Sequence, residues 1–135
     1  MVSIPFGRRP EYGRGFTLIE LLVVMAIVAM LVSIAAPRYF KSVERARENT
    51  LATSLKVMRG ALDQFAADKG RYPESLTELV DARYLRAIPE DPITTSQKTW
   101  LVLAPPIDMA ATGKVFDVRS GAATRGADGR LYADW

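Results

Sequence analysis

The sequence contains neither cysteine nor histidine. Without cysteine the chain can form no disulfide and no thiolate metal site. Without histidine it lacks the commonest general base and the commonest metal ligand. The net charge is only +3, and three of the 18 basic residues lie in the first fifteen positions, so the rest of the chain is nearly neutral. This balance gives no basic surface for nucleic acid, and no nucleophile–base pair or phosphate-binding loop appears. The composition therefore argues against an enzyme and against a nucleic-acid-binding protein.

One long apolar run covers residues 16–36, with the sequence FTLIELLVVMAIVAMLVSIAA. Twenty-one residues at about 1.5 Å per residue span roughly 31 Å, close to the hydrocarbon thickness of a bilayer. The run therefore predicts a transmembrane or membrane-anchoring helix. A cleaved secretory signal peptide is one alternative, because Arg8, Arg9 and Arg14 precede the run and Ser33-Ile34-Ala35 is a small-x-small pattern. The run is longer than the usual apolar region of such a peptide. A signal anchor with no further role is the second alternative.

Glu20 is the only ionisable residue in the apolar run. A carboxylate inside a membrane helix is costly and usually marks a functional position. If the chain were cut after Gly15, Phe16 would carry a new α-amine four positions before Glu20. Glu20 then has two candidate partners: the amine of its own chain, or the amine of a neighbouring subunit. The second pairing would also fix the stagger between packed helices.

The segment Gly15-Phe16-Thr17-Leu18-Ile19-Glu20, followed by an unbroken apolar span, resembles the cleavage and methylation motif of type IV pilins and type II secretion pseudopilins. The resemblance implies that a prepilin peptidase cuts between Gly15 and Phe16 and that the Phe16 amine is N-methylated. It also implies that Phe16 and Glu20 serve in subunit assembly. Pro37 lies where such helices often bend, and a proline there kinks or locally melts a helix.

The resemblance implies three regions. Residues 1–15 form a cleaved leader, residues 16–36 form the hydrophobic membrane and assembly helix, and residues 37–135 form a periplasmic globular domain that includes the second half of the helix. This domain would stay outside the cytoplasm while the helix spans the inner membrane once.

An apolar stripe with helical spacing follows the membrane segment. The stripe consists of Leu51, Leu55, Met58, Leu62 and Phe65. It predicts that the helix continues to Lys69, with Gly70 as a C-cap, and that this face packs against the sheet of the domain. Lys56, Arg59 and Asp63 fall off the stripe, so they are expected to face water or neighbouring subunits.

The remaining segments predict a small sheet and a short second helix. Ser75 and Glu78 form a capping-box pattern at the start of that helix. Residues 99–103 and 114–118 are rich in aromatic and β-branched residues and predict two strands, and Asp128-Gly129 predicts a turn. We expect Trp100, Trp135 and the tyrosines to pack in the core, although a binding surface is the alternative. The fold class predicted is α+β, a pilin-like long helix packed on a small antiparallel sheet.

The order of these pieces is similar to that of the major pseudopilins of type II secretion. The similarity rests on Arg71-Tyr72-Pro73, Tyr84-Leu85, Ile88-Pro89-Glu90-Asp91-Pro92 and the Gly- and Asp-rich C-terminal stretch. It implies a structural subunit that leaves the inner membrane, assembles into a periplasmic pseudopilus and promotes protein export across the outer membrane. The implied partners are other copies, minor pseudopilins, the inner-membrane assembly platform, the prepilin peptidase and membrane lipid, but no nucleic acid.

Two other functions remain open from the sequence. One is a type IV pilin or competence pseudopilin used in adhesion, motility or DNA uptake. The other is a membrane-anchored periplasmic binding module that does not polymerise.

Calcium is the one cofactor that the resemblance suggests. Major pseudopilins bind calcium in a C-terminal loop, and the resemblance implies that Asp117, Ser120, Asp128 and Asp134 are candidate ligands. Calcium takes six to eight oxygen ligands from carboxylates, carbonyls and water. The alternative is that Asp128-Gly129 is only a hairpin turn and that Asp117 is a solvated strand residue.

Overall fold

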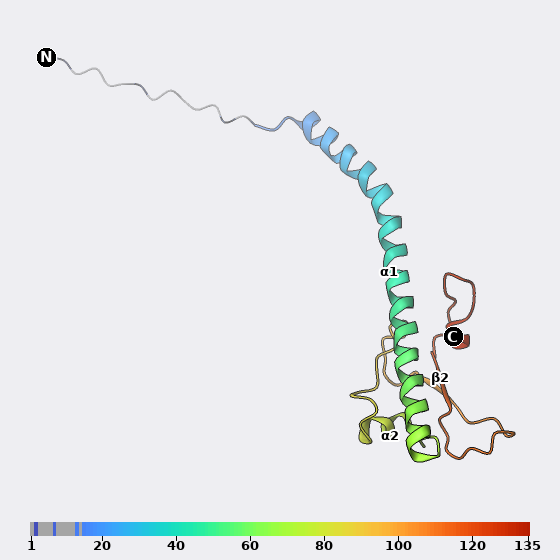
Figure 1. Ribbon diagram of the computed structural model, residues 1–135. Helices are drawn as coiled ribbons and strands as arrows, with labels where there is room; N and C mark the ends of the chain where they lie inside the picture. Colours follow the sequence, from blue (N-terminus) through green and yellow to red (C-terminus); the bar gives the residue numbers. More distant parts are fainter. Residues whose placement is uncertain (1, 3–6, 8–12, 14) are drawn as a thin grey trace. The chain divides into compact units, whose positions relative to one another are not determined.

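The computed structural model describes residues 2, 7, 13 and 15–135 (Figure 1). The helices and strands, in chain order, are α1 (Leu18–Lys69), α2 (Leu76–Asp81), β1 (Leu101–Leu103), β2 (Asp117–Arg119) and the 3-10 helix η1 (Tyr132–Asp134). The chain divides into two compact units, Met1–Tyr39 and Phe40–Trp135. A long N-terminal helix followed by a small antiparallel sheet is the α+β, pilin-like architecture that the sequence predicts.

Helix α1 contains 52 residues and begins two residues after the predicted start. Its helical assignment continues through Pro37, because proline adopts a helical φ and its ring removes only one backbone hydrogen bond. Local melting at Pro37 is therefore absent, and a bend there stays a prediction. Gly70 ends the helix as predicted: its φ is +68° and its N–H donates to Ala66 O at 2.9 Å.

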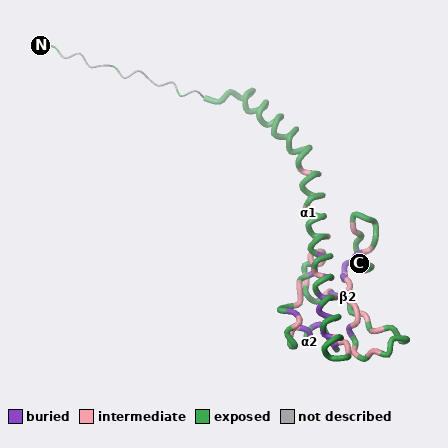
Figure 2. The backbone as a smooth tube through the Cα atoms, in the orientation of Figure 1, coloured by how far each residue is buried: buried purple, intermediate pink, exposed green. Residues whose placement is uncertain are grey.

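The core of the second unit forms on the predicted stripe of α1. Each of its five residues, Leu51 to Phe65, has at most 3% of its surface exposed, and they appear as the purple part of the helix in Figure 2. Burying one large apolar side chain contributes about 1.5–3 kcal/mol relative to leaving it exposed. The other core residues are Ala61, Leu76, Leu79, Leu85, Trp100, Val115, Val118, Ala122 and Tyr132. The core role expected for the aromatic residues is thus confirmed for Trp100 and Tyr132.

Strands β1 and β2 pair antiparallel, with Val102 opposite Val118. Both are shorter than predicted, and β2 begins three residues late. The N–H groups of Lys114 and Val115 both donate to Pro73 O, so these residues pair with the segment before α2 rather than with β1. The sequence pattern cannot reveal this competition, because the two segments are about 40 residues apart.

Only one of the two hydrogen bonds of the predicted capping box forms at the start of α2. Ser75 Oγ accepts the N–H of Glu78 at 3.3 Å. The Glu78 carboxylate accepts the N–H of Glu74 at 2.7 Å, instead of returning to the Ser75 amide. It also binds Arg71 Nη2 at 2.5 Å, and this hydrogen bond holds the pKa of Glu78 below its usual range. The contact ties the Arg71-Tyr72-Pro73 segment to α2.

Candidate functional site

The first part of α1, from Leu18 to Ile34, has an apolar surface that no other described part of the chain covers. Every large hydrophobic residue from Leu18 to Ile34 is between 45% and 78% exposed, and none of its most apolar 18-residue window is buried. It is the one described helix long and apolar enough to cross a membrane. An apolar surface of this extent marks contact with lipid or with another protein.

The start of α1 places Glu20 in the first helical turn. Thr17 Oγ1 accepts the N–H of Glu20 at 3.2 Å, and Thr17 O accepts the N–H of Leu21 at 3.2 Å. Thr17 is therefore the N-cap, and the carboxylate of Glu20 lies near the positive end of the helix dipole. Thr-x-x-Glu before an apolar run is a recognisable cap signal, so the sequence alone could have identified Thr17 as the N-cap.

The predicted cleavage position lies just before the helix. Gly15 and Phe16 are exposed and have no helical assignment, and Phe16 is 77% exposed. A peptide bond at this position is free of helical hydrogen bonds. Arg8, Arg9 and Arg14 of the predicted leader lie outside the described residues.

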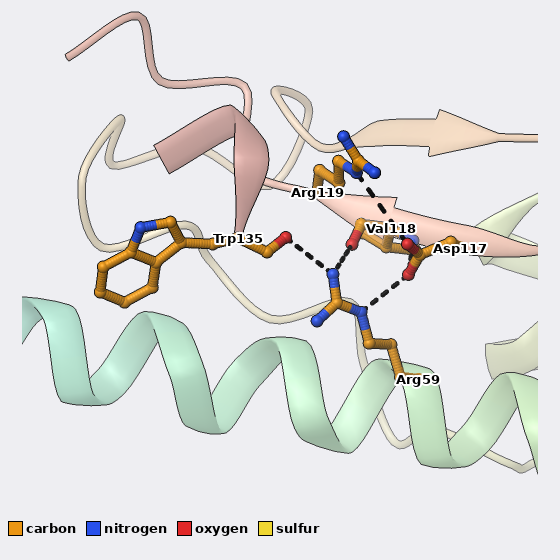
Figure 3. Close-up of polar contacts among 5 residues, drawn as sticks. All are labelled: Arg59, Asp117, Val118, Arg119 and Trp135. Atoms are coloured by element: carbon orange, nitrogen blue, oxygen red, sulfur yellow. Dashed lines mark hydrogen bonds and ion pairs between the residues drawn. The ribbon is translucent and has the colours of Figure 1, made fainter. Parts of the chain in front are cut away.

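Arg59 links the second unit's helix to its C-terminal segment (Figure 3). Its Nε lies 2.7 Å from Asp117 Oδ1, and its Nη2 donates to Val118 O at 2.9 Å and to Trp135 O at 2.7 Å. The prediction that Arg59 faces water or a neighbouring subunit is wrong. The reason is that its partners lie 58 to 76 residues away, a distance at which helical spacing carries no information. Lys56 and Asp63 are exposed as predicted.

Glu48 makes a second link from α1 to the C-terminal segment. Its Oε1 accepts the N–H of Ala127 at 2.7 Å and the hydroxyl of Tyr132 at 3.0 Å. Burial, reinforced by this hydrogen bond, raises the pKa of Tyr132 to about 12. The turn predicted at Asp128-Gly129 is confirmed. It follows Ala127 directly, and the N–H of Gly129 donates to Gly126 O at 3.0 Å.

Two of the three carboxylates predicted to bind calcium are paired with arginines. Asp117 binds Arg59, and Asp128 binds Arg130 at 2.7 Å, which lowers the pKa of Asp128. Asp134 is exposed at the end of η1. No group of three acidic side chains that could hold a metal ion gathers in the part of the chain that the structure describes. Calcium binding at these residues stays a prediction, and it would require Asp117 and Asp128 to exchange their arginine partners for the ion.

Ser120, the fourth calcium candidate, is fully buried and donates its hydroxyl to Asp91 Oδ2 at 2.6 Å. Asp91 is also fully buried, and its Oδ1 accepts the N–H groups of Ile93 and Thr94 at 2.8 and 3.3 Å. This pair joins the Ile-Pro-Glu-Asp-Pro segment to the strand end after β2. Ser120 thus has a structural role that no local sequence pattern indicates.

Comparison with known proteins covers more than half of the chain. The type II secretion system core protein G of Klebsiella pneumoniae is 34% identical over 95 residues, which cover 58% of this chain and 68% of that protein. The chain belongs to the type II secretion system core protein G family. The family described as "Prokaryotic N-terminal methylation motif" matches residues 13–36. That match covers Gly15, Phe16 and Glu20.

Other relatives are also pilins or pseudopilins, and they support a pilin-like structural subunit. The core protein G of Escherichia coli is 29% identical over 101 residues, covering 63% of this chain and 70% of that protein. The type IV major pilin protein PilA of Myxococcus xanthus is 39% identical over 66 residues, covering 49% of this chain but only 30% of PilA. No solved structure matches the chain significantly.

Proposed function

We propose that the chain is a subunit of a type II secretion pseudopilus, assembled through the first part of α1, and that the pseudopilus promotes protein export across the outer membrane. The observation that carries the proposal is the exposed apolar surface from Leu18 to Ile34, in a chain of the core protein G family. Lipid covers this surface before assembly, and the same surface of other copies covers it afterwards. In the inner membrane the globular unit lies on the periplasmic side.

Processing prepares the N-terminus for assembly. A prepilin peptidase hydrolyses the Gly15–Phe16 bond, which lies outside the helix and is exposed, and the new Phe16 amine is methylated. The amine is charged, whereas the peptide nitrogen it replaces is not. Glu20 of a neighbouring subunit pairs with this amine, and the pairing neutralises a carboxylate that would otherwise be unpaired in an apolar layer. Minor pseudopilins and an inner-membrane assembly platform complete the set of partners.

The decisive experiment determines the N-terminal sequence and mass of the mature protein from membranes. A start at Phe16 with one added methyl group supports the proposal. An intact Met1, or a start near Ala36, would contradict it.

A second experiment tests the role of Glu20. Glu20→Ala is expected to abolish filaments, as seen by electron microscopy and shearing, while the protein still inserts and is cleaved. Glu90→Ala serves as a matched control because Glu90 is an exposed carboxylate outside the apolar segment. Filaments that persist in Glu20→Ala would overturn the intersubunit pairing.

A type IV pilin is the second candidate, favoured by the 39% identity to PilA over 66 residues. Deletion of the gene separates the two functions. Accumulation of secreted proteins in the periplasm supports the secretion role, whereas loss of surface pili with normal export supports the pilin role.

Calcium binding through Asp117, Ser120, Asp128 and Asp134 is a separate proposal. A calcium-dependent rise in Tm that Asp128→Asn abolishes would support it. An unchanged Tm at millimolar calcium would contradict it.

A further inference from the structure

The part of α1 that follows the apolar run forms one wall of a shallow hollow. The hollow has a volume of about 220 Å³, and its lining residues are Lys41, Glu44, Arg45 and Ala127. The first three lie on successive turns of α1, and Ala127 belongs to the C-terminal segment that Glu48 holds against the helix. Three of the four lining residues are charged, so the hollow is a polar site rather than an apolar groove.

The three charged side chains of the hollow form no ion pair within the described part of the chain. A lysine and a glutamate three positions apart on a helix are close enough to pair, yet Lys41 and Glu44 do not. Glu48 gives the contrast one turn further on, because its Oε1 accepts the N–H of Ala127 and the hydroxyl of Tyr132. The hollow therefore offers two cations and one anion to a ligand.

The position of these residues along α1 brings them to the depth of lipid headgroups when the apolar run spans a bilayer. Lys41 follows Ala36, the last residue of the run, by five positions, which is a rise of about 7 Å on a helix. The headgroup layer on each side of the hydrocarbon core is about 5–8 Å thick. Arg45 lies one turn further on, but the side chains of a helix lean toward its N-terminus, and a long basic side chain extends toward the membrane surface. Lipid headgroups are therefore the ligands nearest to the hollow.

The charges of the hollow match a headgroup that carries both a phosphate and an ammonium group. A phosphate oxygen accepts charge-assisted hydrogen bonds from the ammonium of Lys41 and the guanidinium of Arg45, and a primary ammonium donates to the carboxylate of Glu44. Phosphoethanolamine has both groups. Phosphoglycerol has no cation for Glu44, and the trimethylammonium of phosphocholine has no N–H to donate. Phosphoethanolamine is therefore the headgroup that pairs all three charges.

We propose that this hollow binds the headgroup of phosphatidylethanolamine, with the phosphate at Lys41 and Arg45 and the ammonium at Glu44. The proposal rests on the proposed function, because it takes the apolar run to span the inner membrane before assembly. The acyl chains of the bound lipid then lie along that run. The headgroup fixes the depth of the unassembled subunit in the bilayer, and it leaves the hollow when the subunit enters the filament.

Native mass spectrometry of the full-length protein, extracted from membranes in detergent, measures the binding. The protein is mixed separately with phosphatidylethanolamine, phosphatidylglycerol and phosphatidylcholine that have the same acyl chains. Phosphatidylethanolamine is expected to bind about two- to fivefold more tightly than the other two, because it makes one additional exposed ion pair, with Glu44. Equal binding of the three lipids, or tightest binding of phosphatidylglycerol, would overturn the proposal. Soluble glycerophosphoethanolamine that binds as tightly as the lipid would also overturn it, because the ligand would then not be a membrane lipid.

Neutral variants assign each charge of the headgroup to its partner. Lys41→Gln and Arg45→Gln are each expected to weaken the binding of all three lipids about two- to fivefold, whereas Lys41→Arg should retain it. Glu44→Gln is expected to weaken the binding of phosphatidylethanolamine alone and so to remove the preference for it. Lys56→Gln and Glu90→Gln are the matched controls, since both residues are exposed and neither lines the hollow. A Glu44→Gln protein that keeps the preference would overturn the proposal.

A larger side chain at Ala127 tests the hollow without changing any charge. Ala127→Leu adds apolar bulk to a residue that lines the hollow, and it is expected to remove the preference for phosphatidylethanolamine. Ala123→Leu is the matched control, since Ala123 is exposed in the same C-terminal segment and does not line the hollow. The Tm of both variants shows that they fold. A folded Ala127→Leu protein that keeps the preference would overturn the proposal, because the lipid would then bind outside the hollow.

Failure of the headgroup site and failure of the proposed function give different results. A protein that starts at methylated Phe16 and forms filaments, but shows no lipid preference, would remove the headgroup site and leave the proposed function intact. Absence of filaments and of an export defect on gene deletion would instead remove the proposed function.

Discussion

Arg59 donates from Nη2 to Trp135 O at 2.7 Å, and the same guanidinium lies 2.7 Å from Asp117 Oδ1. Because one planar group holds both β2 and the segment after η1, it fixes the C-terminal segment against α1 (Figure 3). Arginine suits this position, since its donors form a rigid fork that lysine cannot reproduce. The side chains of Arg59 and Asp117 are 38% and 26% exposed, so water weakens the ion pair.

Arg59→Lys is expected to lower the free energy of unfolding by about 1–2 kcal/mol, because lysine keeps the charge but cannot bind Asp117 and both carbonyls together. The measurement is denaturant unfolding of the full chain in detergent, followed by tryptophan fluorescence. Lys56→Arg is the matched control, since Lys56 is exposed on the same helix and should change stability by less than about 0.5 kcal/mol. Equal stability of Arg59→Lys and the unmodified protein would show that the guanidinium geometry of Arg59 contributes no stability beyond that of its positive charge.

The sequence predicts the elements whose signals are local. The stripe from Leu51 to Phe65, the cap at Ser75 and the stop at Gly70 are each determined within a few residues, and the structure confirms all three. The roles of Arg59 and Glu48 could not be predicted, because their partners lie 58 to 84 residues away. The predicted start of β2 is wrong for the same reason, since Pro73 O accepts hydrogen bonds from the N–H groups of Lys114 and Val115. The cleavage and methylation motif at Gly15, Phe16 and Glu20 is a continuous segment of sequence. These candidate processing and assembly residues can therefore be predicted without knowledge of the tertiary structure.

The buried Ser120–Asp91 pair gives a second prediction. Ser120→Ala is expected to destabilise the protein by about 1–3 kcal/mol, because it removes a hydrogen bond at 2.6 Å from a fully buried carboxylate. Thermal unfolding of the full chain in detergent measures this loss. Ser42→Ala is the control, since Ser42 is exposed on α1. If the two variants unfold at the same temperature, the hydroxyl of Ser120 does not stabilise Asp91.

Tyr132 gives the fold a dependence on alkaline pH. Its pKa is about 12 in the folded chain and about 10 when unfolded, so the folded state holds the proton more tightly. The stabilisation from the neutral phenol is fully present below pH 10 and is lost as the pH rises from about 10 to 12. Tyr132→Phe, which cannot titrate, should be about 0.5–1.5 kcal/mol less stable at pH 8 because the bond to Glu48 is missing.

Measuring both proteins by denaturant unfolding from pH 8 to pH 12 tests this linkage. The stability difference between them should shrink above pH 10, whereas the other tyrosines titrate in both proteins and cancel in the comparison. A difference that stays constant to pH 12 would mean that Tyr132 ionises equally readily in the folded and unfolded states.

Two glycines should respond in opposite directions to the same substitution. Gly60 lies in α1, where an added Cβ would have nothing within 4 Å, so Gly60→Ala should raise the free energy of unfolding by about 0.5–1 kcal/mol through lower backbone entropy of the unfolded chain. Gly113 has a φ of +109°, and a Cβ there would meet Tyr72 O at 2.2 Å. Gly113→Ala should therefore destabilise the protein by more than about 1 kcal/mol. Denaturant unfolding of both variants against the unmodified protein measures the two effects. A Gly113→Ala protein as stable as the unmodified one would show that the backbone at Tyr72 shifts to accommodate the added Cβ.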